Sequence, residues 1–223
     1  MPTRVIPIFP LALVQFPGAL TPLHIFEPRY RQLLRDVQAA DQIFGITCRP
    51  EDPDTGADAP PPGSVGCTVE VIAAQELPDG RSNILCVGGT RYRTRNYLEG
   101  EPYLRAEIEI FEDDPAEEDP GPQAERAAGL FRRVLAASKK LKEAGEEAEA
   151  PELPAEAQAL SFIIAASLDI ELGEKQELLE LTSTAERLRR VNELLADLAT
   201  AYERRAQIHG LSRSNGHGGA LPL

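Results

Sequence analysis

The hydrophobic pattern of this chain changes its period near residue 123. Before that point apolar side chains alternate with polar ones, as in Leu104–Ile110, which is typical of strands with one buried face. Beyond it apolar side chains recur three and four positions apart, which is typical of helices. A chain of 223 residues is long enough for two modest lobes, each with its own core. We therefore expect an α+β fold in which a β-rich lobe is followed by a helical lobe.

The β-rich lobe is expected to be a small, mostly antiparallel barrel or folded sheet with one early helix. Val5–Phe9 predicts a short edge strand, because the prolines in and around it would disrupt a central ladder. Pro28 suits a first helical turn, and the apolar residues after it are spaced for a helix that ends before Ile43. Ile43–Thr47 predicts a strand, and Pro78-Asp79-Gly80 predicts a turn between two strands.

The helical lobe is expected to contain four helices, of which the second is apolar nearly all round and should be buried. The last helix, expected over Thr184–Arg205, carries apolar residues at spacings of three and four, which is typical of a coiled-coil seam or of packing on a neighbouring helix. Packing within the monomer and pairing with a second chain both explain this seam, so a homodimer through residues 184–205 stays open. The expected division of the chain is a β lobe at 1–122, a helical lobe at 123–206 and a disordered tail at 207–223.

The charge of the chain argues against a nucleic-acid partner. Its net charge is -13, whereas phosphate binding depends on clustered Lys and Arg. Much of the excess lies in Glu112–Asp119 and Glu143–Glu152, which we expect to be solvated loops, and Pro50–Gly63 predicts a flexible loop. No apolar run is long enough for a membrane-spanning helix and no signal-peptide cleavage site follows the first residues, so we expect a cytoplasmic protein without a membrane partner.

The three cysteines do not form a metal-binding or disulfide pattern. Cys48, Cys67 and Cys86 are too widely spaced for a Cys-x-x-Cys zinc site, and their odd number fits a reducing compartment. All three lie in apolar, strand-like contexts, which favours small buried hydrophobic side chains over reactive thiols.

Three segments carry a resemblance to a known family. They are the proline-broken stretch from Phe9-Pro10-Leu11 to Tyr30, the pattern Gly88-x-x-Arg91-Tyr92, and Lys175-Gln176-Glu177-Leu178-Leu179-Glu180. In content and order they resemble the N-terminal domain of Lon proteases, from Ile6 to about Tyr202. The resemblance implies a PUA-like β lobe followed by a helical lobe, in a region that helps full-length Lon proteases engage unfolded or damaged proteins.

No catalytic constellation is recognisable in the sequence. The P-loop pattern that cradles phosphates is absent, and Ser138 and Lys139 are neighbours on a predicted helix that point in different directions, which does not suit a Ser-Lys dyad. His24, His209 and His217 are scattered, without metal-ligand spacing. We therefore expect a protein that is not an enzyme and that holds neither a metal nor a cofactor.

Binding is better supported than catalysis. Phe16, Leu23 and Phe26 are large apolar residues in a proline-broken segment that cannot hide them all in one regular element, so some are candidates to line a surface groove, although the core is the alternative. His24 is a candidate contact in the same segment, or else a satisfied histidine at the edge of the core. Arg29 and Arg91 can orient a peptide through a carboxylate or carbonyl, or can form internal salt bridges.

The function expected from the resemblance is binding of unfolded or damaged polypeptide by a stand-alone protein, in substrate recognition or as an adaptor. Docking is expected against the β lobe or in the cleft between the lobes, with a strand added at an exposed edge as one mode. The main alternative is an interaction protein that binds one folded partner through its last helix or its acidic loops. RNA binding through the PUA-like lobe is a third, disfavoured by the acidity.

Overall fold

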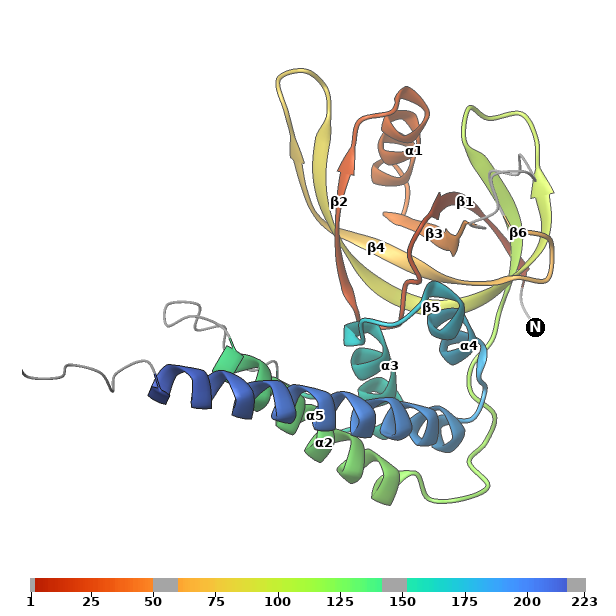
Figure 1. The fold of residues 1–223 in the computed structure, drawn as a ribbon. Helices are drawn as coiled ribbons and strands as arrows, with labels where there is room; N and C mark the ends of the chain where they lie inside the picture. Colours follow the sequence, from red (N-terminus) through yellow and green to blue (C-terminus); the bar gives the residue numbers. More distant parts are fainter. Residues whose placement is uncertain (1–2, 50–59, 142–151, 216–223) are drawn as a thin grey trace, which may run out of the picture. The chain divides into compact units, whose positions relative to one another are not determined.

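The computed structural model describes residues 3–49, 60–141 and 152–215, and the chain forms two compact units. The barrel unit comprises residues 1–115 and 165–183, and the hairpin unit comprises residues 116–164 and 184–223. The α+β class is confirmed: a six-stranded, mostly antiparallel sheet is followed by four helices (Figure 1). The chain does not divide once near residue 122, because residues 165–183 return to the barrel unit.

The sheet of the barrel unit closes on itself. Its strands are β1 (Thr3–Leu11), β2 (Leu20–Ile25), β3 (Ile43–Cys48), β4 (Val65–Glu76), β5 (Ser82–Leu98) and β6 (Leu104–Ile110). Their order is β2-β5-β4-β3-β1-β6, and β5 also pairs with β6. Closure is possible because β5 is long: residues 82–93 pair with β4, and residues 92–98 pair with β6. The ring therefore contains five strands, and β2 is added outside it with β5 as its paired neighbour (Figure 1).

The expectation that the first strand lies at an edge is wrong. β1 pairs with β6 through Thr3–Ile8 and in parallel with β3 through Ile8–Leu11. The two ladders overlap at Ile8 alone, so Pro7 has a paired neighbour only in β6 and Pro10 only in β3. A central strand tolerates these prolines because each has one side on which no ladder hydrogen bond is required.

Helix α1 (Pro28–Gln38) covers the main core of the barrel unit, where the sequence predicted a helix. Pro28 occupies the first turn, and Leu33, Leu34 and Val37 are buried. The core beneath joins this helix to five strands, β1 to β5, through a cluster of buried residues: Phe9, Ile25, Tyr30, Phe44, Ile46, Val69, Val71, Ile84, Cys86 and Tyr103. Pro78-Asp79-Gly80 forms the predicted turn between β4 and β5, with Gly80 at a φ of 78° that glycine adopts without strain.

A second core cluster forms around Tyr92 of β5. Tyr92 is fully buried with Ile6, Ile8 and Ile108, and its hydroxyl donates to the Ile46 carbonyl at 3.1 Å. Burial raises the pKa of this phenol well above its usual range, which keeps the hydroxyl available as a donor. The ring lies directly against Gly66: a Cβ there would sit 2.5 Å from the tyrosine Cζ and hydroxyl.

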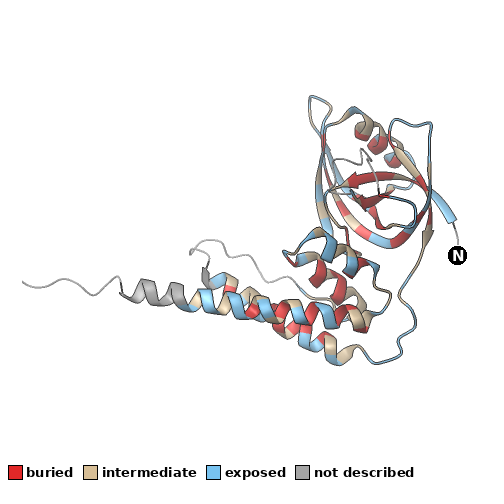
Figure 2. Cartoon of the chain, turned by 45° about the vertical axis from the view of Figure 1, so that its right-hand side comes forward, coloured by how far each residue is buried: buried red, intermediate tan, exposed pale blue. Residues whose placement is uncertain are grey.

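The helices follow the predicted pattern, apart from the length of the last one. α2 (Gly121–Leu141) and α5 (Thr184–Asn215) pack together in the hairpin unit, where both carry stripes of buried residues (Figure 2). The seam residues Leu188, Val191 and Leu195 are completely buried in this unit, so they form an internal core rather than an exposed surface. α3 (Ala157–Ser167) is buried as expected, and α4 (Leu172–Glu180) follows it.

Helix α5 is longer than predicted, since it runs to Asn215 rather than ending near Arg205. Of the predicted disordered tail, residues 216–223 lie outside the described residues, as do residues 50–59 of the predicted flexible loop and residues 142–151 of the second acidic stretch. Across the described ranges, no helix combines the length and apolar character that crossing a lipid bilayer requires.

Gly66→Ala tests the packing of Tyr92. The added methyl group would overlap the tyrosine ring and the Ile46 carbonyl, so we expect a loss of about 1–3 kcal/mol in the free energy of unfolding, measured by urea denaturation. Gly129→Ala is the matched control, because a Cβ at this helical position meets nothing within 4 Å, and the helix should gain up to about 1 kcal/mol. Equal stability of Gly66→Ala and the parent protein would contradict the packing.

The cysteines differ in exposure, and this predicts selective reactivity. Cys67 and Cys86 are buried, as expected, and burial raises the pKa of each thiol to about 12, whereas Cys48 is half-buried. At pH 8 a thiol of pKa 12 is ionised to about 1 part in 10⁴, and the thiolate is the reactive form. Iodoacetamide should therefore modify Cys48 alone in the native protein and all three cysteines in urea, as read by peptide mass spectrometry. Rapid native modification of Cys67 would contradict its burial.

Candidate functional site

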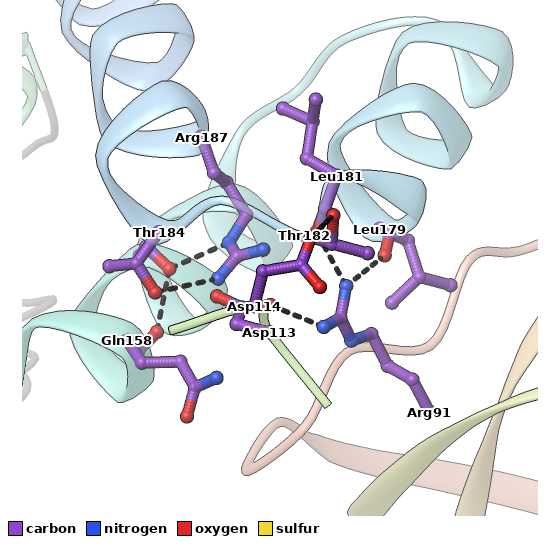
Figure 3. A network of polar contacts seen from close by, with 10 residues as sticks. Arg91, Asp113, Asp114, Gln158, Leu179, Leu181, Thr182, Thr184 and Arg187 are labelled. Atoms are coloured by element: carbon purple, nitrogen blue, oxygen red, sulfur yellow. Dashed lines mark hydrogen bonds and ion pairs between the residues drawn. The ribbon is translucent and has the colours of Figure 1, made fainter. Parts of the chain in front are cut away.

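Arg91 organises the interior of the barrel unit rather than a surface. Its side chain is 2% exposed and forms an ion pair with Asp113. Its Nη1 donates to the Leu179 carbonyl at 2.9 Å and to the Leu181 carbonyl at 2.6 Å, at the end of α4 (Figure 3). These contacts join β5 to the end of α4 and to the segment after β6. The ion pair with Asp113 is an internal salt bridge, one of the two roles that the sequence left open for Arg91.

Asp113 and Asp114 depart from the expectation that their acidic stretch is a solvated loop. Asp113 is the partner of Arg91, with 8% of its side chain exposed. The backbone N–H of Asp114 donates to the Thr182 carbonyl at 2.8 Å, and the Thr182 hydroxyl donates back to Asp114 Oδ2 at 2.6 Å. These carboxylates attach the segment that leaves β6 to the segment that follows α4. Asp113 is therefore withdrawn from a docking partner, whereas Asp114 is exposed but already bonded to Thr182.

The other motif residues also have structural roles. A Cβ on Gly88 would lie 2.0 Å from the Phe16 carbonyl oxygen, so only glycine lets the segment before β2 approach β5 this closely. On α4, Lys175 Nζ donates to the Ala166 carbonyl at 3.3 Å and Gln176 Nε2 donates to the Val65 carbonyl at 3.0 Å. The motifs that attracted attention in the sequence thus hold the barrel unit together.

The free side of β2 is a backbone edge. Gly88 N donates to Ala19 O at 2.9 Å and Gly88 O accepts from Gly18 N at 2.9 Å, so the backbone groups of Gly88 point toward the chain that enters β2. Pairs alternate along an antiparallel ladder, so Thr21, Leu23 and Ile25 are hydrogen-bonded to β5, and the backbone groups of Leu20, Pro22 and His24 point away from it. Within the described sheet no strand pairs with this side of β2. Pro22 lacks an N–H, so the edge offers carbonyls at all three positions and donors at two.

The sheet next to this edge carries exposed and half-buried apolar residues on its outer side, which we call the outer apolar face. It consists of Leu20 and Pro22 on β2, Leu85 and Val87 on β5, and Ile72 on β4. The register pairs Leu20 with Val87 and Pro22 with Leu85, and Ile72 is the extra residue of a bulge beside Leu85. Leu20 is 61% exposed and Ile72 is 49% exposed, so these side chains are offered to solvent. Clustered exposed apolar groups of this kind are typical of protein-binding surfaces.

The comparisons with known proteins settle the family. The family profile described as "ATP-dependent protease La (LON) substrate-binding domain" matches residues 5–197. The chain belongs to this family. Lon protease 2 of Herpetosiphon aurantiacus is 30% identical over 204 residues, and Lon protease of Anaeromyxobacter dehalogenans is 31% identical over 204 residues. The aligned regions cover 87% and 86% of this chain but 24% and 23% of those relatives, so the chain spans about a quarter of their length.

Solved structures agree on the fold of this LON substrate-binding domain. The Lon N-terminal domain protein from Xanthomonas campestris superposes with a TM-score of 0.63 at 23% identity, covering 84% of this chain and 96% of that chain. The N-terminal domain of Mycobacterium avium complex Lon protease gives a TM-score of 0.66 at 16% identity, covering 87% and 99%. The fold implied by the sequence resemblance is therefore confirmed.

The structure separates the residues that the sequence grouped as a peptide site. Phe16 is fully buried, so in this structure it serves the core of the LON domain and not a groove. Leu23 lies on the inner side of β2 and packs against the main core. Arg91 is buried in the network described above. Phe16 and Leu23 therefore contribute to core packing, and Arg91 forms an internal salt bridge. Both roles were alternatives that the sequence left open.

His24 and Phe26 are exposed and lie at the end of β2. His24 Nδ1 is 2.7 Å from Asn83 Oδ1 on β5, and the His24 ring stacks on Phe26 with centroids 6.1 Å apart. Phe26 is 58% exposed and extends the apolar surface past the strand. Arg29 is half-buried, with its guanidinium paired to Glu27 at 3.1 Å and lying over the Tyr30 ring. Of the predicted set, His24 and Phe26 therefore lie next to the outer apolar face.

Sequence reasoning missed Ile72, Leu85 and Val87. The run Ile84-Leu85-Cys86-Val87 contained a signal, because consecutive apolar residues in a strand indicate that both faces are apolar. Ile72 interrupts the alternation of Val69 and Val71, and only the bulge in the register explains it. Among the described residues no group of three or more His, Cys, Asp or Glu side chains is arranged to hold a metal ion. The arrangement suits contact with a polypeptide through backbone and apolar groups.

Removal of the Arg91 side chain should destabilise the LON domain strongly. Arg91→Met leaves Asp113 as a buried carboxylate without its partner, so we expect a loss of about 3–5 kcal/mol in the free energy of unfolding, measured in urea. The double variant Arg91→Met/Asp113→Leu should lose less than the sum of the single variants. Arg189→Met removes exposed ion pairs with Glu118 and Glu186 and should cost below about 1 kcal/mol. An equally small loss for Arg91→Met would contradict its organising role.

Proposed function

We propose that this chain binds polypeptide segments in an extended, unfolded form, in substrate recognition or as an adaptor, without catalysis of its own. The observation that carries the proposal is the outer apolar face beside the open backbone edge of β2 in a LON substrate-binding domain. An extended segment can add a strand to this edge while its apolar side chains cover Leu20 and Ile72. Folded proteins keep their backbone groups paired internally and hide such side chains, so they lack both features.

Two of the predicted contact residues, His24 and Phe26, lie next to the outer apolar face. The exposed Phe26 ring extends the apolar surface, and His24 bonded to Asn83 lines its end. The alternative, docking of one folded partner through the last helix, has less support because Leu188, Val191 and Leu195 of the α5 seam are buried in the hairpin unit, although Leu198 and Tyr202 farther along it are half-buried. Docking through the first acidic stretch is weakened by the internal contacts of Asp113 and Asp114.

The binding test uses fluorescence anisotropy of a labelled, permanently unfolded model protein titrated with the full chain. We expect saturable binding that the folded form of the model protein does not compete. The double variant Leu20→Ser/Ile72→Thr should weaken binding at least tenfold, about 1.4 kcal/mol, because two exposed apolar contacts are lost. Both residues are largely exposed, so the urea midpoint should remain close to that of the parent protein.

Leu98→Thr is the matched control, since Leu98 is an apolar residue of β5, 39% exposed, that lies outside the outer apolar face. It should bind with parental affinity. An equal loss for Leu98→Thr and for the double variant would assign the binding to nonspecific apolar contact. An absence of binding at tens of micromolar would overturn the proposed function.

A further inference from the structure

The first half of β1 has a backbone edge of its own, apart from that of β2. The ladder between β1 and β6 covers Thr3–Ile8, whereas the ladder between β1 and β3 begins only at the pair Ile8–Gly45. Within the described sheet, the side of Thr3–Pro7 that faces away from β6 therefore has no paired strand. We call this side of Thr3–Pro7 the β1 edge.

The hydrogen bonds of β1 show which of its backbone groups face the β1 edge. The Leu11 carbonyl accepts from Arg49 N at 2.8 Å, on the β3 side of the strand. Successive residues direct their backbone groups to opposite sides of a strand, so Pro7, Val5 and Thr3 direct theirs to the same side as Leu11. Pro7 lacks an N–H, which suits a position without a ladder partner. The edge thus offers three carbonyls and the N–H groups of Thr3 and Val5.

The β1 edge borders a groove of about 560 Å³, within the range of ligand pockets, about 300–1,000 Å³. Its walls come from β1, from α1 and from the start of β6, including Val5, Asp36, Val37 and Tyr103. None of its lining residues belongs to the outer apolar face. PDZ and PTB domains bind extended peptides by adding a strand to an open sheet edge, and the same mode suits this groove.

The charges that line the groove leave one carboxylate without a cation. Arg4 is ion-paired with Asp41, and Arg105 is paired with Glu101 at 3.8 Å. These four charges balance within the groove itself. Asp36 of α1 is the remaining charged lining residue, and among the described residues no basic side chain forms an ion pair with it. The groove therefore keeps one uncompensated negative charge.

The Asp36 carboxylate is positioned by two neutral donors. The Tyr103 hydroxyl donates to its Oδ2 at 2.7 Å, and Gln32 Nε2 donates to its Oδ1 at 2.7 Å. Each carboxylate oxygen has room for a further hydrogen bond, and Asp36 is half-buried, so it remains accessible from the groove. An ammonium or guanidinium group matches this acceptor, because charge-assisted hydrogen bonds are about twice as strong as neutral ones.

We infer that this groove binds an extended polypeptide segment that carries a Lys or Arg side chain, with its backbone paired to the β1 edge and its cation on Asp36. Alternate side chains of an added strand point to one face, so every second residue of the segment faces α1, which carries Asp36. The inference goes beyond the proposed function, because it stands on the groove alone. The outer apolar face selects apolar side chains, whereas this groove selects a basic one.

The binding test uses fluorescence anisotropy of short labelled peptides titrated with the full chain. The peptides alternate Thr and Val and differ only at the central residue, which is Lys, Gln or Glu. We expect the Lys peptide to bind at least fivefold more tightly than the Gln peptide and the Glu peptide to bind more weakly than both, because Asp36 attracts the cation and repels the carboxylate. Equal affinities for the Lys and Gln peptides would overturn the inference.

Asp36→Asn removes the charge and keeps the shape of the side chain. We expect it to weaken binding of the Lys peptide at least fivefold and to make the affinities for the Lys and Gln peptides equal, which a merely structural effect would not do. Glu76→Gln is the matched control, because it removes the same charge from an exposed residue of β4 outside the groove, and it should keep the parental preference for Lys. A parental preference in Asp36→Asn would overturn the inference.

Backbone N-methylation of the Lys peptide tests the strand pairing on the unaltered protein. Only alternate residues of an added strand direct their N–H groups to the β1 edge. Methylation of the odd-numbered amides and methylation of the even-numbered amides should therefore differ at least tenfold in their effect on affinity. Hydrogen exchange of the chain saturated with the Lys peptide should also show protection of the Val5 amide. Equal effects of the two methylation patterns would overturn the pairing.

The outcomes separate this inference from the proposed function. Leu20→Ser/Ile72→Thr should bind the Lys peptide with parental affinity, since neither residue lines the groove. A loss for this variant equal to that of Asp36→Asn would place the peptide on the outer apolar face, which overturns the groove and leaves the proposed function intact. Peptide binding that depends on Asp36, together with unfolded-protein binding that Leu20→Ser/Ile72→Thr leaves unchanged, would support the groove and overturn the outer apolar face.

Discussion

The buried guanidinium of Arg91 is the contact on which the arrangement of the barrel unit depends. The chain leaves the barrel unit after residue 115 and returns at residue 165, so strand pairing alone cannot hold the returning segment. Arg91 holds it by binding two carbonyls at the end of α4 and the Asp113 carboxylate at once. The planar, five-donor guanidinium suits this task, whereas a lysine ammonium cannot serve three acceptors in such a fixed geometry.

The closure of the ring explains why a binding surface remains. Because β5 pairs with both β4 and β6, five strands satisfy one another, and β2 is left with β5 as its paired neighbour. A strand added outside a closed ring keeps a backbone edge, and natural proteins usually blunt such edges against aggregation. Here Pro22 removes one donor from the edge, while Leu20 and Ile72 remain exposed beside it. An edge that is retained together with apolar side chains is suited to capturing another extended chain.

Local patterns predicted elements well and long-range pairing poorly. Alternation in Leu104–Ile110 and helical spacing after Gln123 depend on neighbouring residues, and both predictions are confirmed. The prediction that β1 is an edge strand was wrong. Pro7 and Pro10 are tolerated because each has a paired strand on one side only, and the identity of those neighbouring strands cannot be read from a local pattern. The burial of Phe16 and Arg91 depends in the same way on partners far along the chain. Ile72 became visible as a surface residue only through a register shift.

Hydrogen–deuterium exchange of the full chain, with and without a saturating unfolded model protein, tests the central claim most directly. A strand added to β2 will hydrogen-bond its outward amides, so we expect protection concentrated at Leu20 and His24, with little change in the buried ladder of β1, β3 and β4. Pro22 has no amide and leaves a gap between them. Protection confined to α2 and α5, or no protection under conditions where binding is saturated, would contradict the account.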